Sequence, residues 1–216
     1  MAKTRIPKLY LSGESDADAL LSRDPLALLI GMVLDQQIPL EWAFAAPAKL
    51  RERLKHELDA AEIAGYEEEK LIRMFTGPPA LHRFPGSMAK RVQQMCRHLV
   101  DEYDGDAASV WTHAVDGADL LRRVQALPGF GEQKARIFIG LLGKQYGVAP
   151  PGWQEAAGVF GRPGTYFSVA DITDLQTLEL VRAHKQDMKA AAKANQAGEA
   201  TKAVKAKSAV KATKGA

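Results

Sequence analysis

The alternation of apolar and polar positions along the chain predicts a protein built mainly from helices. Asp24 and Pro25 are typical of the N-cap and the first turn of a helix. The segment that follows, residues 26–34, carries no polar side chain on any side. Because a helix that is apolar all round is covered by the rest of the protein, we expect residues 24–34 to form a buried central helix.

A helix with one apolar face is predicted from Met88 to Tyr103, with Ser87 as its N-cap. Its apolar side chains recur at three- and four-residue steps, the spacing of one face of an α-helix: Val92, Met95, Cys96, Leu99, Val100 and Tyr103. The single cysteine of the chain lies on this face. We therefore expect Cys96 to be a buried core thiol rather than a nucleophile.

Two further helices are predicted on either side of a short glycine-containing turn. Residues 118–126 form the first, and the second starts near Glu132 and ends near Gly147. Their apolar positions again follow the helical period. The loop of residues 82–86, which includes His82 and Arg83, is expected to be solvated.

The segment that follows the second of these helices is expected to be less regular. Residues 148–165 are rich in glycine and proline and predict irregular structure. Residues 166–169 fit either a short strand or a bend. Asp174 is expected to cap a last helix that runs through Val181.

The composition limits the classes of protein to which the chain can belong. Its 216 residues, 46% hydrophobic and 25% charged, fit one domain or two small, closely packed ones. One cysteine excludes an internal disulfide and an iron–sulfur cluster held by cysteines, and the five histidines lack the spacing of zinc ligands. No apolar run reaches the roughly 18 residues of a membrane span, and no signal-peptide core follows the start. We therefore expect a cytoplasmic protein that binds no membrane.

The charge is distributed unevenly along the chain. Residues 189–216 hold seven lysines and one acid, a formal charge of +6, and the chain total of +3 leaves −3 for residues 1–188. The segment is rich in alanine and has no aromatic residue, so it is predicted to be disordered in the free protein. Its spaced lysines suit either sequence-independent binding to a polyanion such as nucleic acid or a solubilising tail.

The turn at residues 127–131, with the sequence LPGFG, lies between two predicted helices. Its glycines permit backbone conformations closed to other residues and leave the amides at the start of the next helix open to an anion. With Lys134 in the first turn of that helix, the segment suits a phosphate clamp that ignores base identity. A plain helix–helix turn is the alternative. A dinucleotide fingerprint is excluded, because the loop follows a helix and lacks a third glycine.

This hairpin resembles the helix-hairpin-helix motif of the HhH-GPD superfamily, the endonuclease III-like DNA glycosylases. The similarity covers LPGFGEQKA at residues 127–135, the segment from 87 to 106, and the buried helix that ends in the DQQ sequence of residues 35–37. These landmarks occur in the family's order over about residues 24–148. The resemblance implies an all-α, two-lobed helical bundle of the DNA-glycosylase type, here with a disordered basic tail.

The resemblance and the composition together predict four segments along the chain. Residues 1–23 are expected to pack on the body, and residues 24–148 to form the HhH-GPD-like helical domain with its hairpin. Residues 149–188 are expected to form an irregular loop and the final helix. Residues 189–216 are the Lys/Ala-rich tail.

Proteins of this superfamily extrude one nucleotide from duplex DNA and break its N-glycosidic bond. The resemblance implies a carboxylate near the sugar, which stabilises the developing oxocarbenium ion and orients water. The family's aspartate follows the second hairpin helix, where this chain has Pro150 and Pro151. The candidates are therefore Asp35, at the end of the buried helix, and Glu155. Asp171 and Asp174 are expected to be turn and cap residues.

Bifunctional members of the family also carry a lysine immediately after the hairpin, which attacks the sugar and permits strand cleavage. Gln133 occupies that position here, and Lys134 is rotated from it by about 100° around the helix. We therefore predict no lyase activity and assign Lys134 to a phosphate contact.

The predicted DNA-binding residues are those of the hairpin: Leu127, Pro128, Gly129, Phe130, Gly131, Gln133 and Lys134. Gln36 and Gln37 are candidates to fill the gap left by an extruded base, or else they satisfy backbone groups at a helix end. Trp42 and Phe44 fit core packing better than stacking on a base. For the loop of residues 82–86, the alternative to a solvated loop is one that reaches DNA. The resemblance also implies a monovalent cation held by hairpin carbonyl groups, and the side chains indicate no metal site.

These features predict a base-excision repair protein, associated with the nucleoid, that binds double-stranded DNA as a monomer and uses no iron–sulfur cluster. The first hypothesis is a monofunctional DNA glycosylase, a hydrolase that acts on a damaged or mispaired base. The alternative is a non-catalytic DNA-binding relative that recognises lesions or shapes DNA. A helical protein-interaction module is a third hypothesis, which an absence of salt-dependent DNA affinity would favour.

Overall fold

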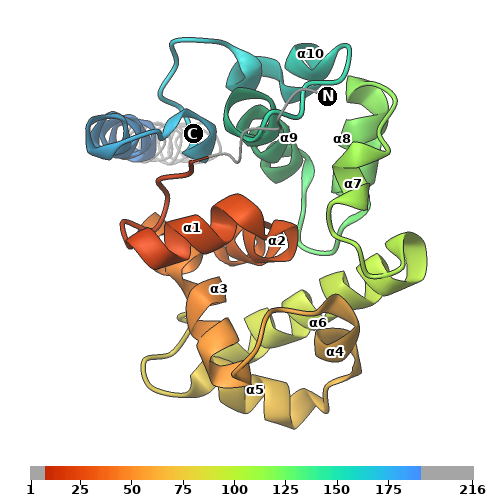
Figure 1. Cartoon of the computed structure of the whole chain (residues 1–216). Helices are drawn as coiled ribbons and strands as arrows, with labels where there is room; N and C mark the ends of the chain where they lie inside the picture. Colours follow the sequence, from red (N-terminus) through yellow and green to blue (C-terminus); the bar gives the residue numbers. More distant parts are fainter. Residues whose placement is uncertain (1–7, 191–216) are drawn as a thin grey trace, which may run out of the picture.

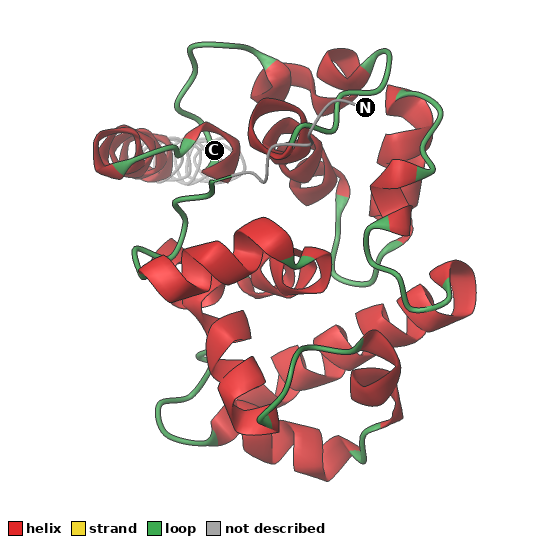
Figure 2. Ribbon diagram, in the orientation of Figure 1, coloured by secondary structure: helices red, strands yellow, loops and turns green. Residues whose placement is uncertain are grey.

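The computed structural model describes residues 8–190, and these residues form helices and turns without a strand (Figure 2). The helices group into two lobes, with α1 (Ser15–Arg23) and α2 (Pro25–Leu34) between them (Figure 1). The lower lobe in that view contains α3 (Leu40–Leu54), α4 (Ala60–Gly65), α5 (Glu68–Thr76) and α6 (Pro85–Tyr103). The upper lobe contains α7 (Ser109–Thr112), α8 (Gly117–Ala126), α9 (Glu132–Leu141) with its π-helical continuation Leu142–Tyr146, and α10 (Trp153–Ala157). The predicted all-α, two-lobed architecture is confirmed.

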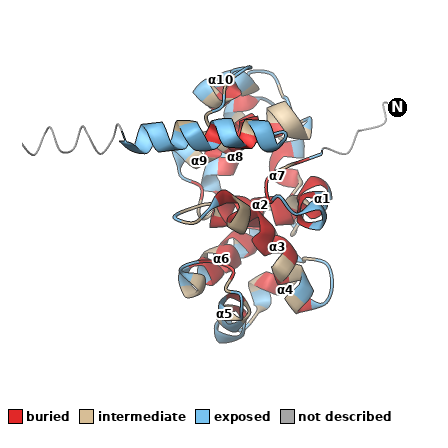
Figure 3. Cartoon of the chain, turned by 90° about the vertical axis from the view of Figure 1, so that its left-hand side faces the viewer, coloured by how far each residue is buried: buried red, intermediate tan, exposed pale blue. Residues whose placement is uncertain are grey.

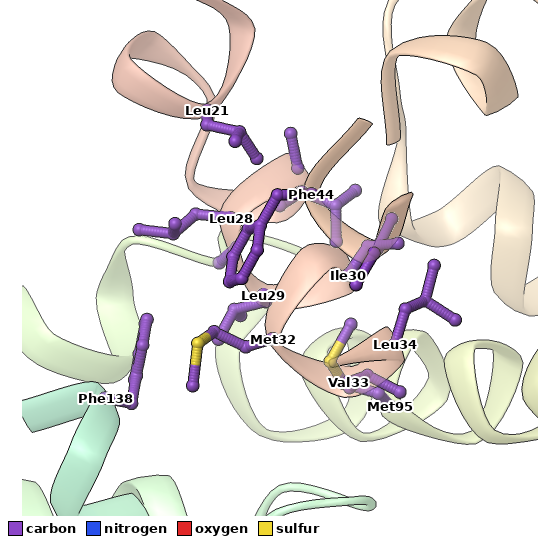
Figure 4. Close-up of a cluster of buried hydrophobic side chains, with 14 of the residues drawn as sticks. Leu21, Leu28, Leu29, Ile30, Met32, Val33, Leu34, Phe44, Met95 and Phe138 are labelled. Carbon is purple, nitrogen blue, oxygen red and sulfur yellow. The ribbon is translucent and has the colours of Figure 1, made fainter. Parts of the chain in front are cut away.

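The predicted buried helix is α2. Asp24 caps it, because its carboxylate accepts hydrogen bonds at 2.9 and 3.1 Å from two backbone N–H groups of the first turn, and Pro25 is the first helical residue. Every residue from 26 to 34 is buried. Gly31 lets the ring of Phe44 on α3 approach so closely that a Cβ atom would lie 2.7 Å from ring atom Cδ1. The core of the described chain is therefore built around this helix (Figure 4).

The two lobes meet α2 through different side chains. Phe138 of α9 and Met95 of α6 are both fully buried and approach α2 from the two lobes (Figure 4). One hydrophobic cluster therefore connects both lobes through the central helix. In the part of the chain that the structure describes, none of the helices is long and apolar enough to cross a membrane.

The amphipathic helix predicted from Met88 is α6, but it begins earlier, at Pro85. The N-cap is Phe84, and Ser87 lies inside the first turn instead of capping it. A proline at the first helical position already has the φ that a helix needs and lacks the N–H that a cap would satisfy, which corrects the predicted start. The buried face is confirmed: Cys96 lies in the core, and burial raises the pKa of its thiol.

The segment from 148 to 165 is more ordered than its glycine and proline content indicated. It contains α10 and a 3-10 turn, Gly158–Gly161. Tertiary packing holds this segment in place, because the ring of Trp153 lies on Gly143, where a Cβ atom would be 2.3 Å from the ring. Only glycine permits this contact, and the expectation of irregular structure is corrected.

The segment before the last described helix is a bend that leads into a 3-10 turn, Val169–Asp171, and not a strand. The carboxylate of Asp171 accepts hydrogen bonds from the backbone N–H groups of Phe167 and Ser168 at 2.9 and 3.2 Å, which closes the bend. Asp174 caps the helix over residues 175–190 by accepting from the N–H of Thr177 at 2.8 Å. The turn and cap roles predicted for the two aspartates are therefore confirmed.

Candidate nucleic-acid interface

The turn between α8 and α9 is fixed to the core by its two apolar residues. Leu127 and Phe130 are buried, and the ring of Phe130 packs edge-on against Phe138 with ring centroids 5.6 Å apart. Gly129 has a φ of 96°, a conformation that favours glycine. The side chains of Leu127 and Phe130 therefore position the turn, and what it offers to a partner is its backbone and Pro128.

Gly131 leaves the start of α9 uncovered. It is the N-cap of α9, and no atom of residues 8–190 beyond its chain neighbours lies within 4 Å of the position that a Cβ atom would occupy. No side chain of the described chain caps this helix. The first N–H groups of a helix lack intrahelical partners and carry the positive end of its dipole. The backbone is therefore uncovered at Gly131, as the sequence predicted, whereas Gly129 packs against Arg91 and Val33. Binding of an anion at the start of α9 stays a prediction.

Lys134 does not point toward the uncovered backbone at Gly131. Its ammonium donates hydrogen bonds to the backbone carbonyl oxygens of Met32, Val33 and Asp35 at 2.5, 3.2 and 3.3 Å, at the C-terminal end of α2. Burial lowers the pKa of Lys134 to about 8, while the negative charge of Asp35 opposes that shift. In the structure, Lys134 therefore binds the end of α2 and is not directed at a phosphate, which corrects the contact assigned from the sequence.

The depressed pKa of Lys134 predicts a stability that rises with pH. Between about pH 8 and the ordinary lysine value near 10.5, the folded protein has lost the Lys134 proton and the unfolded chain still holds it. Because stability rises with pH wherever the unfolded state binds more protons, the cost of burying this charge disappears across that interval. The unfolding free energy of the native chain, minus that of a Lys134→Met variant, should rise by up to about 3 kcal/mol.

Urea denaturation of both chains at pH 7.5 and 10 measures this difference. Groups that titrate in both chains cancel in the subtraction. An unchanged difference would show that Lys134 keeps its ordinary pKa in the folded protein.

The loop that follows α2 separates the two predicted gap-filling glutamines. Gln36 is engaged within the protein: its amide nitrogen donates to the carbonyl oxygen of Val33 at 2.7 Å, and its amide oxygen accepts from Arg91 at 3.1 Å. Gln37 is exposed and holds a φ of 57°, the left-handed region that few residues other than glycine adopt. The helix-terminal interpretation therefore fits Gln36, and Gln37 is the glutamine whose side chain is accessible.

His82 anchors the same loop from the other side. It is 1% exposed, so the expectation of a solvated loop is wrong for His82, whereas Arg83 and Phe84 are exposed as expected. The Nδ1 atom of His82 accepts the N–H of Phe84, so Nε2 carries the proton and donates to the carbonyl oxygen of Gln36 at 2.9 Å. Burial lowers the pKa of His82, in keeping with this neutral form.

The two aromatic residues that follow the loop after α2 pack as predicted. Phe44 lies in the core, and Trp42 is half-buried and donates to the backbone carbonyl oxygen of Ala80.

Beside the start of α9 lies a cleft of about 460 Å³, within the roughly 300–1,000 Å³ of typical small-molecule sites. Asp35 lines it from the end of α2, and Gln133 and Ile137 line it from one face of α9. The other walls come from the segment after α10 and from the helix over residues 175–190, which crosses the upper lobe in Figure 3. They are largely aromatic and apolar, with two polar side chains, Ser168 and Lys185, among Val159, Phe160, Phe167, Val169, His184 and Met188. Among the described residues that line the cleft, Asp35 carries the single carboxylate.

The other carboxylates near the upper lobe lie elsewhere. Glu155 is exposed on α10 and lines a separate hollow with Arg162. Asp171 is buried in an ion pair with Lys144 at 2.5 Å, in addition to closing the bend. Of the two acids predicted as catalytic, the structure thus places Asp35 in the cleft and Glu155 outside it.

Sequence reasoning did not find the aromatic wall of the cleft or the side chains that hold the loop after α2. Phe160 and Phe167 come from a segment expected to be irregular, where no periodicity indicates a face. Arg91 lies on α6 and His82 lies in the loop before it, far along the chain from Gln36. Only folding brings these two side chains to the loop after α2. The recurrence of Gln133 and Ile137 four residues apart is the one local signal that both face the same side of α9.

Comparison with known families agrees with this geometry. A family model described as HhH-GPD superfamily base excision DNA repair protein matches residues 30–202, most of the chain. The chain therefore belongs to the HhH-GPD superfamily, and its role lies in base excision repair of DNA. The comparisons with curated proteins and with solved structures return no match.

Proposed function

We propose that this protein is a monofunctional DNA glycosylase that removes a damaged or mispaired base from double-stranded DNA. The observation that carries the proposal is the position of Asp35, whose carboxylate lines an apolar cleft next to the uncovered start of α9. The hairpin gives a place for the DNA backbone, and the cleft gives a place for one extruded base.

The mechanism follows from the chemistry of these groups. Backbone N–H groups at the start of α9 hold a phosphate, and the extruded base stacks among Phe160, Phe167 and His184. The bond between the sugar carbon and the base breaks, and its electron pair leaves with the base. The charge of Asp35 stabilises the oxocarbenium ion that develops on the sugar and orients the water that attacks it. The apolar walls strengthen this electrostatic interaction by excluding bulk water. The proton of the attacking water passes to the carboxylate and on to solvent, and the departing base takes up a proton from solvent.

Two side chains support hydrolysis without strand cleavage. Gln133 lines the cleft at the position where bifunctional members of the family carry a lysine, and an amide does not form a Schiff base. The amine of Lys134 is occupied by the carbonyl groups of α2. Lys185 also lines the cleft, but it lies on a different helix from the family's lysine. The proposed product is therefore an abasic site in an intact strand.

The test uses the purified protein, which we propose acts as a monomer. The substrates are duplexes that carry uracil, oxidised bases or alkylated bases. Nicks revealed only by alkali support the proposed glycosylase, because alkali cleaves the strand at abasic sites. Nicks formed without alkali contradict the monofunctional assignment. Tight binding without base release supports a non-catalytic relative, and an absence of salt-dependent binding excludes both.

The hairpin is tested by replacing Gly131 with tryptophan. Gly131 has an ordinary φ of −75° and open space around it, so stability should change by no more than about 0.5 kcal/mol. The indole would cover the backbone of the turn, and duplex affinity measured by fluorescence anisotropy should fall about tenfold or more, the loss of one or two charge-assisted hydrogen bonds. The matched control is Gly65→Trp, at an equally open exposed glycine at the end of α4. Equal affinities of the two variants would reject the backbone contact.

A further inference from the structure

We propose that Lys134 is a positioning residue, whose ammonium fixes the end of α2 so that the carboxylate of Asp35 faces the cleft. The inference rests on the proposed glycosylase function. It adds a group that touches neither the DNA nor the reacting atoms, and it joins the helix that follows the DNA-binding turn to the proposed catalytic carboxylate.

The end of α2 needs a donor from elsewhere in the chain. The last carbonyl groups of a helix have no intrahelical partners, and here the chain leaves the helix at once, because the N–H of Gln36 turns back to the carbonyl oxygen of Leu34 at 2.7 Å. The ammonium of Lys134 supplies a donor to the carbonyl oxygens of Met32 and Asp35. It shares the carbonyl oxygen of Val33 with the side-chain amide of Gln36. A positive charge at this end also opposes the negative end of the helix dipole.

The contacts reach the residue that carries the carboxylate. One of the three acceptors is the carbonyl oxygen of Asp35 itself, and Asp35 is the C-cap of α2. Fixing this peptide group limits the backbone rotation that would turn the carboxylate away from the cleft. A displacement of about 1 Å at a reacting centre can cost about 10²-fold in rate, so this restraint has a direct consequence for catalysis.

Three charged or titratable groups surround the Lys134 ammonium on the elements packed around it. Asp35, at the end of α2, opposes the lowering of the Lys134 pKa, and the positive charge of Arg91 on α6 adds to it. Lys134 in turn lowers the pKa of His82, in the loop before α6. Arg91 and His82 bind Gln36, the next residue along. Lys134 is therefore the contact that ties this loop to α9 and the hairpin.

The kinetic test compares Lys134→Met and Lys134→Arg with the native chain. Lys134→Met should lower the single-turnover rate of base release about 10²-fold and leave the dissociation constant for the duplex within about twofold. Lys134→Arg keeps the charge and should recover most of the rate. A Lys134→Met variant with the native rate would overturn the proposal. If Lys134→Met does not fold, a Lys134→Arg variant with a different pH profile still tests it.

The pH profile is the measurement that a merely structural role would not change. The native rate should fall above about pH 8, where Lys134 loses its charge, and the fall should be absent in Lys134→Arg, since a guanidinium stays protonated. Asp35, Arg91 and His82 are common to both chains. Identical profiles for the native chain and Lys134→Arg would contradict the inference.

A spectroscopic measurement separates this inference from the proposed function. The amide resonance of Gln36 in a ¹H–¹⁵N spectrum should shift in Lys134→Met, because that N–H directly follows the carbonyl that Lys134 contacts, and an unmoved resonance would overturn the inference. If the native chain releases no base from any duplex, the glycosylase proposal fails while this readout still decides on the contact. A further outcome is that the native chain is active while Asp35→Asn is inactive and Lys134→Met keeps the native rate. That combination of results rejects only the positioning role.

Discussion

Replacing Asp35 with asparagine is expected to lower the rate of base release by about 10²- to 10³-fold, the usual effect of removing one group that stabilises transition-state charge. Asparagine has nearly the same shape as aspartate, so the cleft should keep its form and duplex affinity should stay within about twofold. What disappears is the negative charge that faces the developing oxocarbenium ion. Single-turnover assays on the best duplex substrate, followed by alkali, measure this rate.

The matched control for Asp35→Asn is Glu155→Gln. Both changes neutralise an acid that was predicted from the sequence as the catalytic carboxylate. Glu155, however, is exposed and lines a different hollow. Glu155→Gln should therefore keep the native rate. Retention of full activity by Asp35→Asn would remove Asp35 from the mechanism, and loss of activity in Glu155→Gln alone would transfer the role to that residue.

Deleting residues 191–216 is expected to weaken DNA binding strongly and to reduce its salt dependence. The expectation for this segment rests on charge alone, because residues 191–216 lie outside the described residues. The segment holds six lysines and one acid, a net charge of +5. Each phosphate neutralised contributes about 0.9 to the slope of log affinity against log salt. The slope should therefore decrease by up to about 4.5 units if every net charge engages DNA.

Fluorescence anisotropy is measured at several salt concentrations from about 50 to about 200 mM. It gives the slope of log affinity against log salt for both chains. A full-length chain with the six lysines changed to glutamine is the control for length. It should behave like the deletion if charge is the cause. A slope that neither change alters would leave the segment as a spacer without a role in binding.

Several elements could be predicted from the sequence because their causes are local. Asp24 and Pro25 start α2 through a cap and a fixed φ, and the absence of polar side chains in 26–34 requires burial. Asp174 caps the last described helix through a hydrogen bond three residues away. Local signals failed where two of them competed: Ser87 is a good cap, but Pro85 had already started the helix.

The direction of Lys134 could not be predicted, because its partners are about a hundred residues away along the chain. The sequence shows a lysine in the first turn of a helix after a glycine turn, which is compatible with a phosphate contact or an internal one. A side chain with four rotatable bonds takes the direction in which its charge is best satisfied. Here the carbonyl groups at the end of α2 satisfy it, and only the packing of α9 on α2 brings them within reach.

The sequence by itself determined the helical class, the buried central helix, the open glycine turn and the superfamily, since each depends on residues that are neighbours along the chain. The tertiary structure alone decided that Asp35 shares a cleft with Gln133 while Glu155 does not, and that Gln37 is exposed while Gln36 is half-buried. A cleft is made from side chains of several elements, and its walls form only when those elements pack. Periodicity fixes which face of a helix is apolar, but not which distant polar group that face will meet.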